Sequence, residues 1–178
     1  MLKITLGILA LVLLAGAAAL GVGALRDPAW SVSRTLFIEA PASRLHADVA
    51  DLRAWSAWTP WSAREDATRV ETASGPVAAP GQVVSWTADK QGAGQMTLTA
   101  VSAERVAYDA VIPQGVVHGE VALAPTTGGT LVTWTLRSEM PNPVGRAFVP
   151  LLQRFIGADL ERGLTNLRSN HTSALAAK

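Results

Sequence analysis

The sequence predicts an α+β domain in which a curved antiparallel sheet of about six to seven strands wraps around one long C-terminal helix. Two patterns indicate this fold. Short alternating β segments separated by glycine and proline turns fill the middle of the chain, and a broad apolar stripe at helical spacing follows from Pro143. An uncharged run from Ile4 to Leu25 precedes them. We therefore divide the chain into an apolar segment (1–30), one folded domain (31–170) and a frayed tail (171–178).

Composition excludes several classes of function. The net charge is +1 and the arginines form no basic run, so nucleic acid is not an expected partner. The chain has no cysteine, which excludes disulfides, thiolate catalysis and cysteine-ligated zinc. The histidines, His46, His118 and His171, are not at metal-ligand spacing. We therefore expect no metal and no cofactor.

The N-terminal apolar run is long enough to cross a hydrocarbon core of about 30 Å. It could be an uncleaved membrane anchor, with Trp30 near the far interface, or a secretory signal cleaved at 15–17 or 17–19. We favour the anchor because the apolar run continues past both cleavage sites to Leu25. The protein would then cross the membrane once, and its folded domain would lie on the extracytoplasmic side. With a cleaved signal it would be secreted or periplasmic.

The folded domain begins with a strand and short helices. Ser31–Ala40 alternates between two faces, and Pro41 ends this predicted strand. A helix follows, because Leu45, Val49 and Leu52 recur at helical spacing. A further helical turn is predicted over 54–58.

Six further strands are predicted from alternation between turns. They cover residues 69–73, 82–90, 95–101, 106–113, 116–124 and 130–137. Their close spacing favours one antiparallel meander.

The last helix is predicted from Pro143 over about 25–28 residues. Its apolar stripe must pack on the sheet and contains Phe148, Leu151, Leu152, Phe155, Ile156, Leu160, Leu164 and Leu167. Gly157 and Gly163 are tolerable inside this helix if they allow close approach to a strand or leave space over a cavity.

A single helix cannot fill the interior of a sheet that curls around it, so we expect a residual apolar cavity. Its walls would come from the inward positions of the strands, which include Met96 and Val132. A tryptophan cluster after the first helices would close one end. The predicted ligand-binding residues are Trp55, Trp58, Trp61, Trp86, Tyr108 and Trp134. Tryptophans in mid-strand, such as Trp86 and Trp134, are more often plain core, and the Tyr108 hydroxyl could equally bond a ligand or a core partner.

Four stretches in this order resemble the START-like (SRPBCC, helix-grip) superfamily. They are Asp51–Trp61, Gly81–Trp86, Gly129–Trp134 and Gly157–Leu167. The likeness is greatest to the polyketide cyclase/dehydrase-like branch that carries an N-terminal hydrophobic helix. It implies a cavity for a hydrophobic ligand under the C-terminal helix, and it implies no shared chemistry, because members bind lipids, cyclise polyketides or bind proteins.

Candidates for acid–base chemistry are few. His118 and Glu120 share a strand face, but Val117 and Val121 mark the opposite face as the buried one. Asp51 is more typical of a structural cap than of a catalytic acid. We therefore assign no catalytic residue.

The expected function is binding of a hydrophobic small molecule or lipid by a domain tethered to a membrane through its N-terminal helix. One alternative is a cyclase- or dehydratase-like enzyme that uses the same cavity and has an ionisable group aimed inward. The other is a protein-interaction module with a filled core and no ligand.

Overall fold

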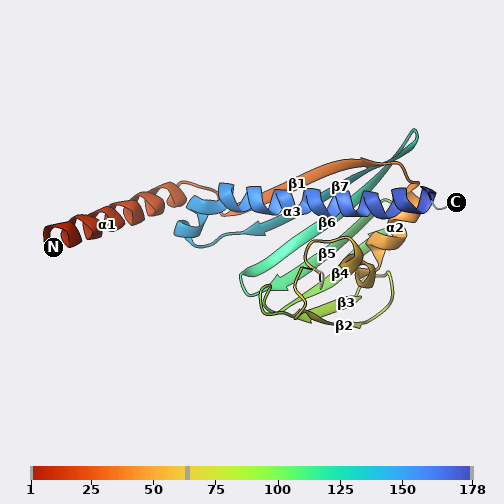
Figure 1. The fold of residues 1–178 in the computed structure, drawn as a ribbon, viewed down its shortest axis with the longest axis horizontal. Coiled ribbons are helices and arrows are strands. Elements are labelled where there is room, and N and C mark those ends of the chain that lie inside the picture. The colour runs from red at the N-terminus through yellow and green to blue at the C-terminus, as the bar shows by residue number, and fades with distance from the viewer. Residues whose placement is uncertain (1, 63–64, 177–178) are drawn as a thin grey trace.

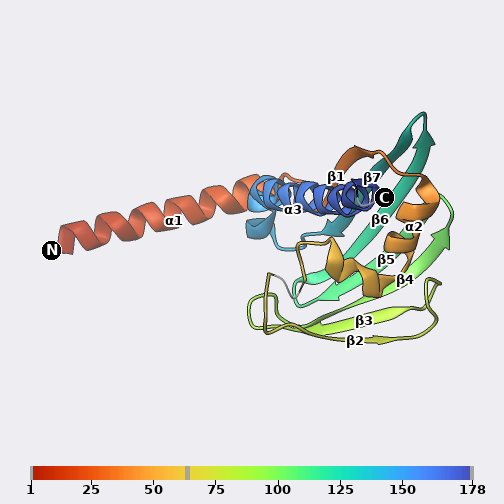
Figure 2. The ribbon, with the colours of Figure 1, turned by 45° about the vertical axis from the view of Figure 1, so that its right-hand side comes forward.

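The computed structural model describes residues 2–62 and 65–176, and it shows a protruding N-terminal helix, one curved sheet and a long C-terminal helix (Figures 1 and 2). Helix α1 (Leu2–Ala24) precedes strand β1 (Ala29–Ile38). Helix α2 (Ala42–Ala50) and the 3-10 helix η1 (Leu52–Ala57) follow. The remaining elements are β2 (Val70–Ser74), β3 (Val83–Thr87), β4 (Gly94–Ser102), β5 (Arg105–Ile112), β6 (Gly115–Thr126), β7 (Gly129–Glu139) and α3 (Pro143–Ala176).

The seven strands form one antiparallel sheet in the order β1-β7-β6-β5-β4-β3-β2. Strands β2 to β7 form a meander. Strand β1 lies at the edge of the sheet and pairs with β7, with Val32 opposite Leu136. Helix α3 crosses the concave side of this sheet (Figure 2). The predicted α+β helix-grip fold is confirmed.

The ends of two elements differ most from the prediction. Strand β3 ends at Thr87, not at residue 90. The backbone amides of Asp89 and Lys90 donate to Thr68 Oγ1 and Asp66 Oδ2, and not to a carbonyl of a neighbouring strand. Helix α3 runs for 34 residues, so the predicted frayed tail is helical as far as Ala176. His171 Nε2 lies 2.6 Å from Asp48 Oδ2, which ties this last part of α3 to α2. Residues 177 and 178 of the predicted tail lie outside the described residues.

The core lies where the second half of α3 meets the sheet. Leu160, Leu164 and Leu167 are fully buried there, each contributing about 1.5–3 kcal/mol of apolar burial. Gly163 allows the close approach expected of it: a Cβ at this position would lie 2.7 Å from Cζ3 of Trp134. The large indole of β7 can therefore lie directly against the helix backbone.

Helix α1 is the only element of the described chain that is long and apolar enough to cross a membrane, a property that a signal sequence shares. Its C-terminal end packs on the start of α3, where Gly23 lies against the Pro143 carbonyl. The linker strengthens this junction, because Arg26 Nη1 donates to the carbonyl oxygens of Arg146 (3.3 Å) and Ala147 (3.1 Å). The rest of α1 extends away from the sheet (Figure 1).

Candidate functional site

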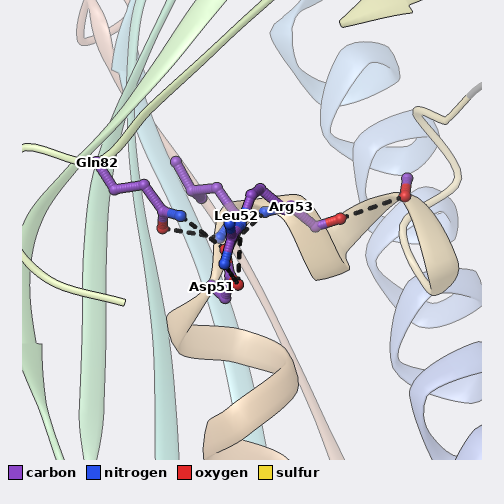
Figure 3. Close-up of polar contacts among 5 residues, drawn as sticks. Asp51, Leu52, Arg53 and Gln82 are labelled. Carbon is purple, nitrogen blue, oxygen red and sulfur yellow. Dashed lines mark hydrogen bonds and ion pairs between the residues drawn. The ribbon is translucent and has the colours of Figure 1, made fainter. Parts of the chain in front are cut away.

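The tryptophan-rich segment is held in place by a polar clamp between η1 and the start of β3 (Figure 3). Asp51 caps η1 by accepting from the Arg53 amide at 3.1 Å, and the Arg53 guanidinium closes on the same carboxylate. The buried Gln82 joins them, because its Nε2 donates to Asp51 Oδ1 (2.6 Å) and its Oε1 accepts from the Leu52 amide (3.0 Å). Asp51 is thus a structural residue, as predicted.

Five aromatic rings form one cluster beneath this clamp. Trp55 is at its centre, with ring centroids 4.9 Å from Trp58, 4.8 Å from Tyr108 and 5.8 Å from Trp134. Trp61 joins the cluster through Trp134 at 5.5 Å. Most of these pairs are edge-to-face, an arrangement that adds about 0.5–1.5 kcal/mol per pair beyond area burial.

A cavity of about 570 Å³ lies between η1, the concave face of the sheet and the first half of α3. Its wall is mainly apolar and includes four of the six predicted ligand-binding residues: Trp55, Trp61, Trp86 and Tyr108. Leu152 and Ile156 of α3 close it from above the sheet. Further apolar wall comes from strand residues, which include Val84, Met96, Ala110, Val117 and Leu136.

The other two predicted residues, Trp58 and Trp134, lie behind the wall that the described residues form. Both are fully buried, as is Val132, which was also expected to face the cavity. Each indole has an internal partner: Trp58 Nε1 donates to the Asp48 carbonyl (3.4 Å), and Trp134 Nε1 donates to the Tyr108 hydroxyl (2.9 Å). They support the rings that line the cavity, and they do not line it themselves.

Tyr108 has a core partner and also lines the cavity. Its ring lies across the backbone of Gly119 on β6, where a Cβ would come 2.0 Å from the ring. Burial raises the pKa of the phenol far above its ordinary value, and the bond from Trp134 opposes this rise only in part. The hydroxyl therefore stays protonated at accessible pH and is no general base.

One end of the cavity is polar, a feature that sequence reasoning missed. The Arg69 side chain is only 6% exposed and pairs with Glu71. Its Nη1 donates to Gln91 Oε1 at 2.7 Å, and its guanidinium lies 4.5 Å above the Trp86 ring. The signal available in the sequence was an arginine and a glutamate that share the parity of one strand beside a predicted cavity-lining tryptophan.

His118 and Glu120 face away from the cavity, as predicted. His118 Nδ1 lies 2.6 Å from Asp109 Oδ1, and Arg105 Nε donates to Glu120 at 2.8 Å, both pairs being on the outer face of the sheet. In the described part of the chain, no group of three His, Cys, Asp or Glu side chains is placed to hold a metal ion.

The fold and the cavity together define a helix-grip domain built to hold a hydrophobic ligand. The model of the family described as "Polyketide cyclase / dehydrase and lipid transport" matches residues 29–172, and this chain belongs to that family. The match begins with β1 and so excludes α1. A search of curated proteins gave no match.

Solved structures share the fold at low identity. A protein from Thermus thermophilus is 21% identical with a TM-score of 0.60, over 82% of this chain and 99% of that one. A protein from Chromobacterium violaceum is 17% identical with a TM-score of 0.55, over 79% and 96%. The di-domain ARO/CYC StfQ of the steffimycin biosynthetic pathway is 12% identical with a TM-score of 0.64, over 81% of this chain and 51% of StfQ. This chain thus spans about half the length of StfQ.

Proposed function

We propose that this protein binds an apolar or amphipathic small molecule, such as a lipid, in the cavity beneath α3 while α1 tethers it to a membrane. The observation that carries the proposal is the cavity of about 570 Å³ with its ring-lined wall. That volume lies within the range of about 300–1,000 Å³ that is typical of small-molecule sites. A protein-interaction module with a filled core would lack a cavity of this size.

The chemistry of the wall defines the kind of ligand. Apolar contacts with Trp55, Trp61 and the strand residues favour a hydrophobic body, because burial gains about 25 cal/mol per Å² removed from water. At the polar end, Arg69 and Glu71 neutralise each other. A neutral hydroxyl or carbonyl on the ligand suits this pair better than a free charge does.

The same observations favour binding over catalysis. An acid–base mechanism needs an ionisable group that faces the ligand and can exchange a proton near neutral pH. Of the ionisable groups that line the cavity, Tyr108 stays protonated, Arg69 and Glu71 pair with each other, and Glu139 lies at the solvent-exposed end of β7. The His118–Asp109 pair is on the other side of the sheet.

Native mass spectrometry of the full chain tests the proposal after incubation with a total lipid extract. We expect a bound species on the wild type, and at least about tenfold lower occupancy when Ala110→Phe fills the cavity. Val117→Phe, opposite Ala110 on β6, is a second and independent block. Ala107→Phe is the matched control, because Ala107 is on β5 like Ala110 but on the outer face of the sheet, and this variant should bind like the wild type. Absence of any bound species on the wild type would contradict the proposal.

A further inference from the structure

Helix α3 carries an exposed apolar stripe on its first half, which we call the α3 stripe and define as Val144, Phe148, Leu151 and Phe155. These residues recur at helical spacing and share one face. Phe148 is 57% exposed and Phe155 is 64% exposed, although their periodicity predicts that both pack on the sheet. Large apolar side chains grouped on a surface mark an interaction site.

The α3 stripe begins where the candidate membrane span ends. Gly23 of α1 packs against Pro143, the first residue of α3, and Arg26 bonds the carbonyls of Arg146 and Ala147. Both ribbon views show α1 leaving the domain at this end of α3 (Figures 1 and 2). A bilayer crossed by α1 would therefore meet the domain at the α3 stripe.

The cavity reaches the same end of the domain. Its wall there includes Trp30 at the start of β1, Met140 just after β7 and Gly115 at the start of β6. Phe148 of the α3 stripe lies one helical turn before Leu152, which lines the cavity together with Ile156. One apolar row along α3 thus runs from the exposed surface into the cavity.

We propose that the α3 stripe rests in the surface of the bilayer that α1 crosses, and that the ligand is a membrane lipid that enters the cavity along this row. The inference rests on the proposed function for the tether and the binding site. An apolar helix face that lies in an interface is buried about 5–10 Å into the headgroup and acyl boundary. The charges near the α3 stripe fit this position. Arg154 is exposed, and the guanidinium groups of Arg26 and Arg146 are held at the junction of α1 and α3 by backbone carbonyl oxygens. These three positive charges outnumber the nearby carboxylates Asp27 and Glu139, which favours anionic headgroups.

The absence of cysteine makes the test direct, because single cysteines can be introduced and labelled without background. Phe148→Cys in the full chain, labelled with an environment-sensitive fluorophore, is placed in nanodiscs of phosphatidylcholine and phosphatidylglycerol. We expect its emission to shift to shorter wavelength and to lose intensity when brominated lipids replace ordinary ones. The matched control is Phe37→Cys, since Phe37 is also an exposed phenylalanine (39%) but is close to the opposite end of β1.

Lipid content is measured on the same samples by native mass spectrometry, with Phe148→Glu compared with Phe37→Glu. We expect Phe148→Glu to lose bound lipid and Phe37→Glu to keep it. A label at position 148 that is no more quenched than one at position 37, or a full chain that does not enter nanodiscs, overturns the inference. If lipid is bound but the label at position 148 stays in water, the proposed function is supported and only this inference is wrong. Lipid contact at position 148 without any bound lipid overturns entry into the cavity and the proposed function together.

Discussion

The Tyr108 hydroxyl and the Trp134 indole form the hydrogen bond on which the buried part of the aromatic cluster depends. Their 2.9 Å bond is inside the core, and it satisfies an indole N–H that has no access to water. A buried donor that loses its acceptor costs about 1–3 kcal/mol, more than the bond itself contributes. The role of Tyr108 is therefore structural as well as ligand-facing.

We predict that Tyr108→Phe lowers the free energy of unfolding by about 1–3 kcal/mol, because it leaves Trp134 Nε1 unpaired. Urea unfolding followed by circular dichroism measures the change. Thr35→Val is the control: it removes a hydroxyl bond between Thr35 and Thr133 that is exposed to solvent, and it should change stability by no more than about 0.5 kcal/mol. Equal losses in the two variants would contradict this account.

At the scale of elements, the clamp between Asp51 and Gln82 fixes η1 relative to the sheet. We predict that Asp51→Ala destabilises the protein by about 1–3 kcal/mol, because the buried Gln82 amide and the Arg53 amide lose their acceptor. Urea unfolding at neutral pH measures this loss. Glu104→Ala, in the exposed turn between β4 and β5, is the control and should have almost no effect.

The same clamp gives a pH dependence of known sign. Bonds from Arg53, followed by those from Gln82, lower the pKa of Asp51 to about 2 although partial burial opposes them. Because the folded pKa lies below the unfolded one, the carboxylate stabilises the fold above about pH 4 and loses this effect as the pH falls towards 2. The stability difference between the wild type and Asp51→Ala should therefore shrink over that window. A constant difference in urea midpoints from pH 7 to about pH 2 would contradict the assignment.

The elements themselves were predictable because each depends on local signals. Alternation on β5 and β6 placed Tyr108 and Val117 inward and His118 outward, and all three positions were confirmed. The length of α3 was not predictable, because its last turns depend on the pairing of His171 with Asp48, which is distant in sequence. Phe148 and Phe155 were misplaced for a related reason: helical periodicity finds an apolar face but not how far the sheet extends beneath it.

At the scale of the whole molecule, the position of α1 depends on its close contact with α3. A Cβ added at Gly23 would lie 1.6 Å from the Pro143 carbonyl oxygen, so we predict that Gly23→Leu displaces α1 from α3. Spin labels on Leu14→Cys and Arg168→Cys, both exposed positions, should then show a changed or broadened distance distribution. Gly21→Leu is the matched control, because no atom lies within 4 Å of its added Cβ. Identical distributions for the two variants would exclude this packing.

The site as a whole was only partly predictable. The order of motifs identified the fold and the existence of a cavity, and four of the six predicted aromatic residues line it. Which tryptophans face inward depends on how η1 is tilted by the Asp51–Gln82 clamp, and no local pattern gives that tilt. The Arg69–Glu71 pair at the polar end was missed because its burial depends on Gln91 and Trp86, which come from a later turn and strand.

The cluster around Trp55 also limits how this protein can evolve. Trp55 contacts Trp58, Tyr108 and Trp134 and also faces the cavity, so a substitution that reshapes this side of the site also weakens the core. Met96, Ala110 and Val117 face the same cavity from strands and belong to no ring cluster. Changes of ligand preference within the lineage should therefore accumulate at these strand positions, while the aromatic side of the site varies little.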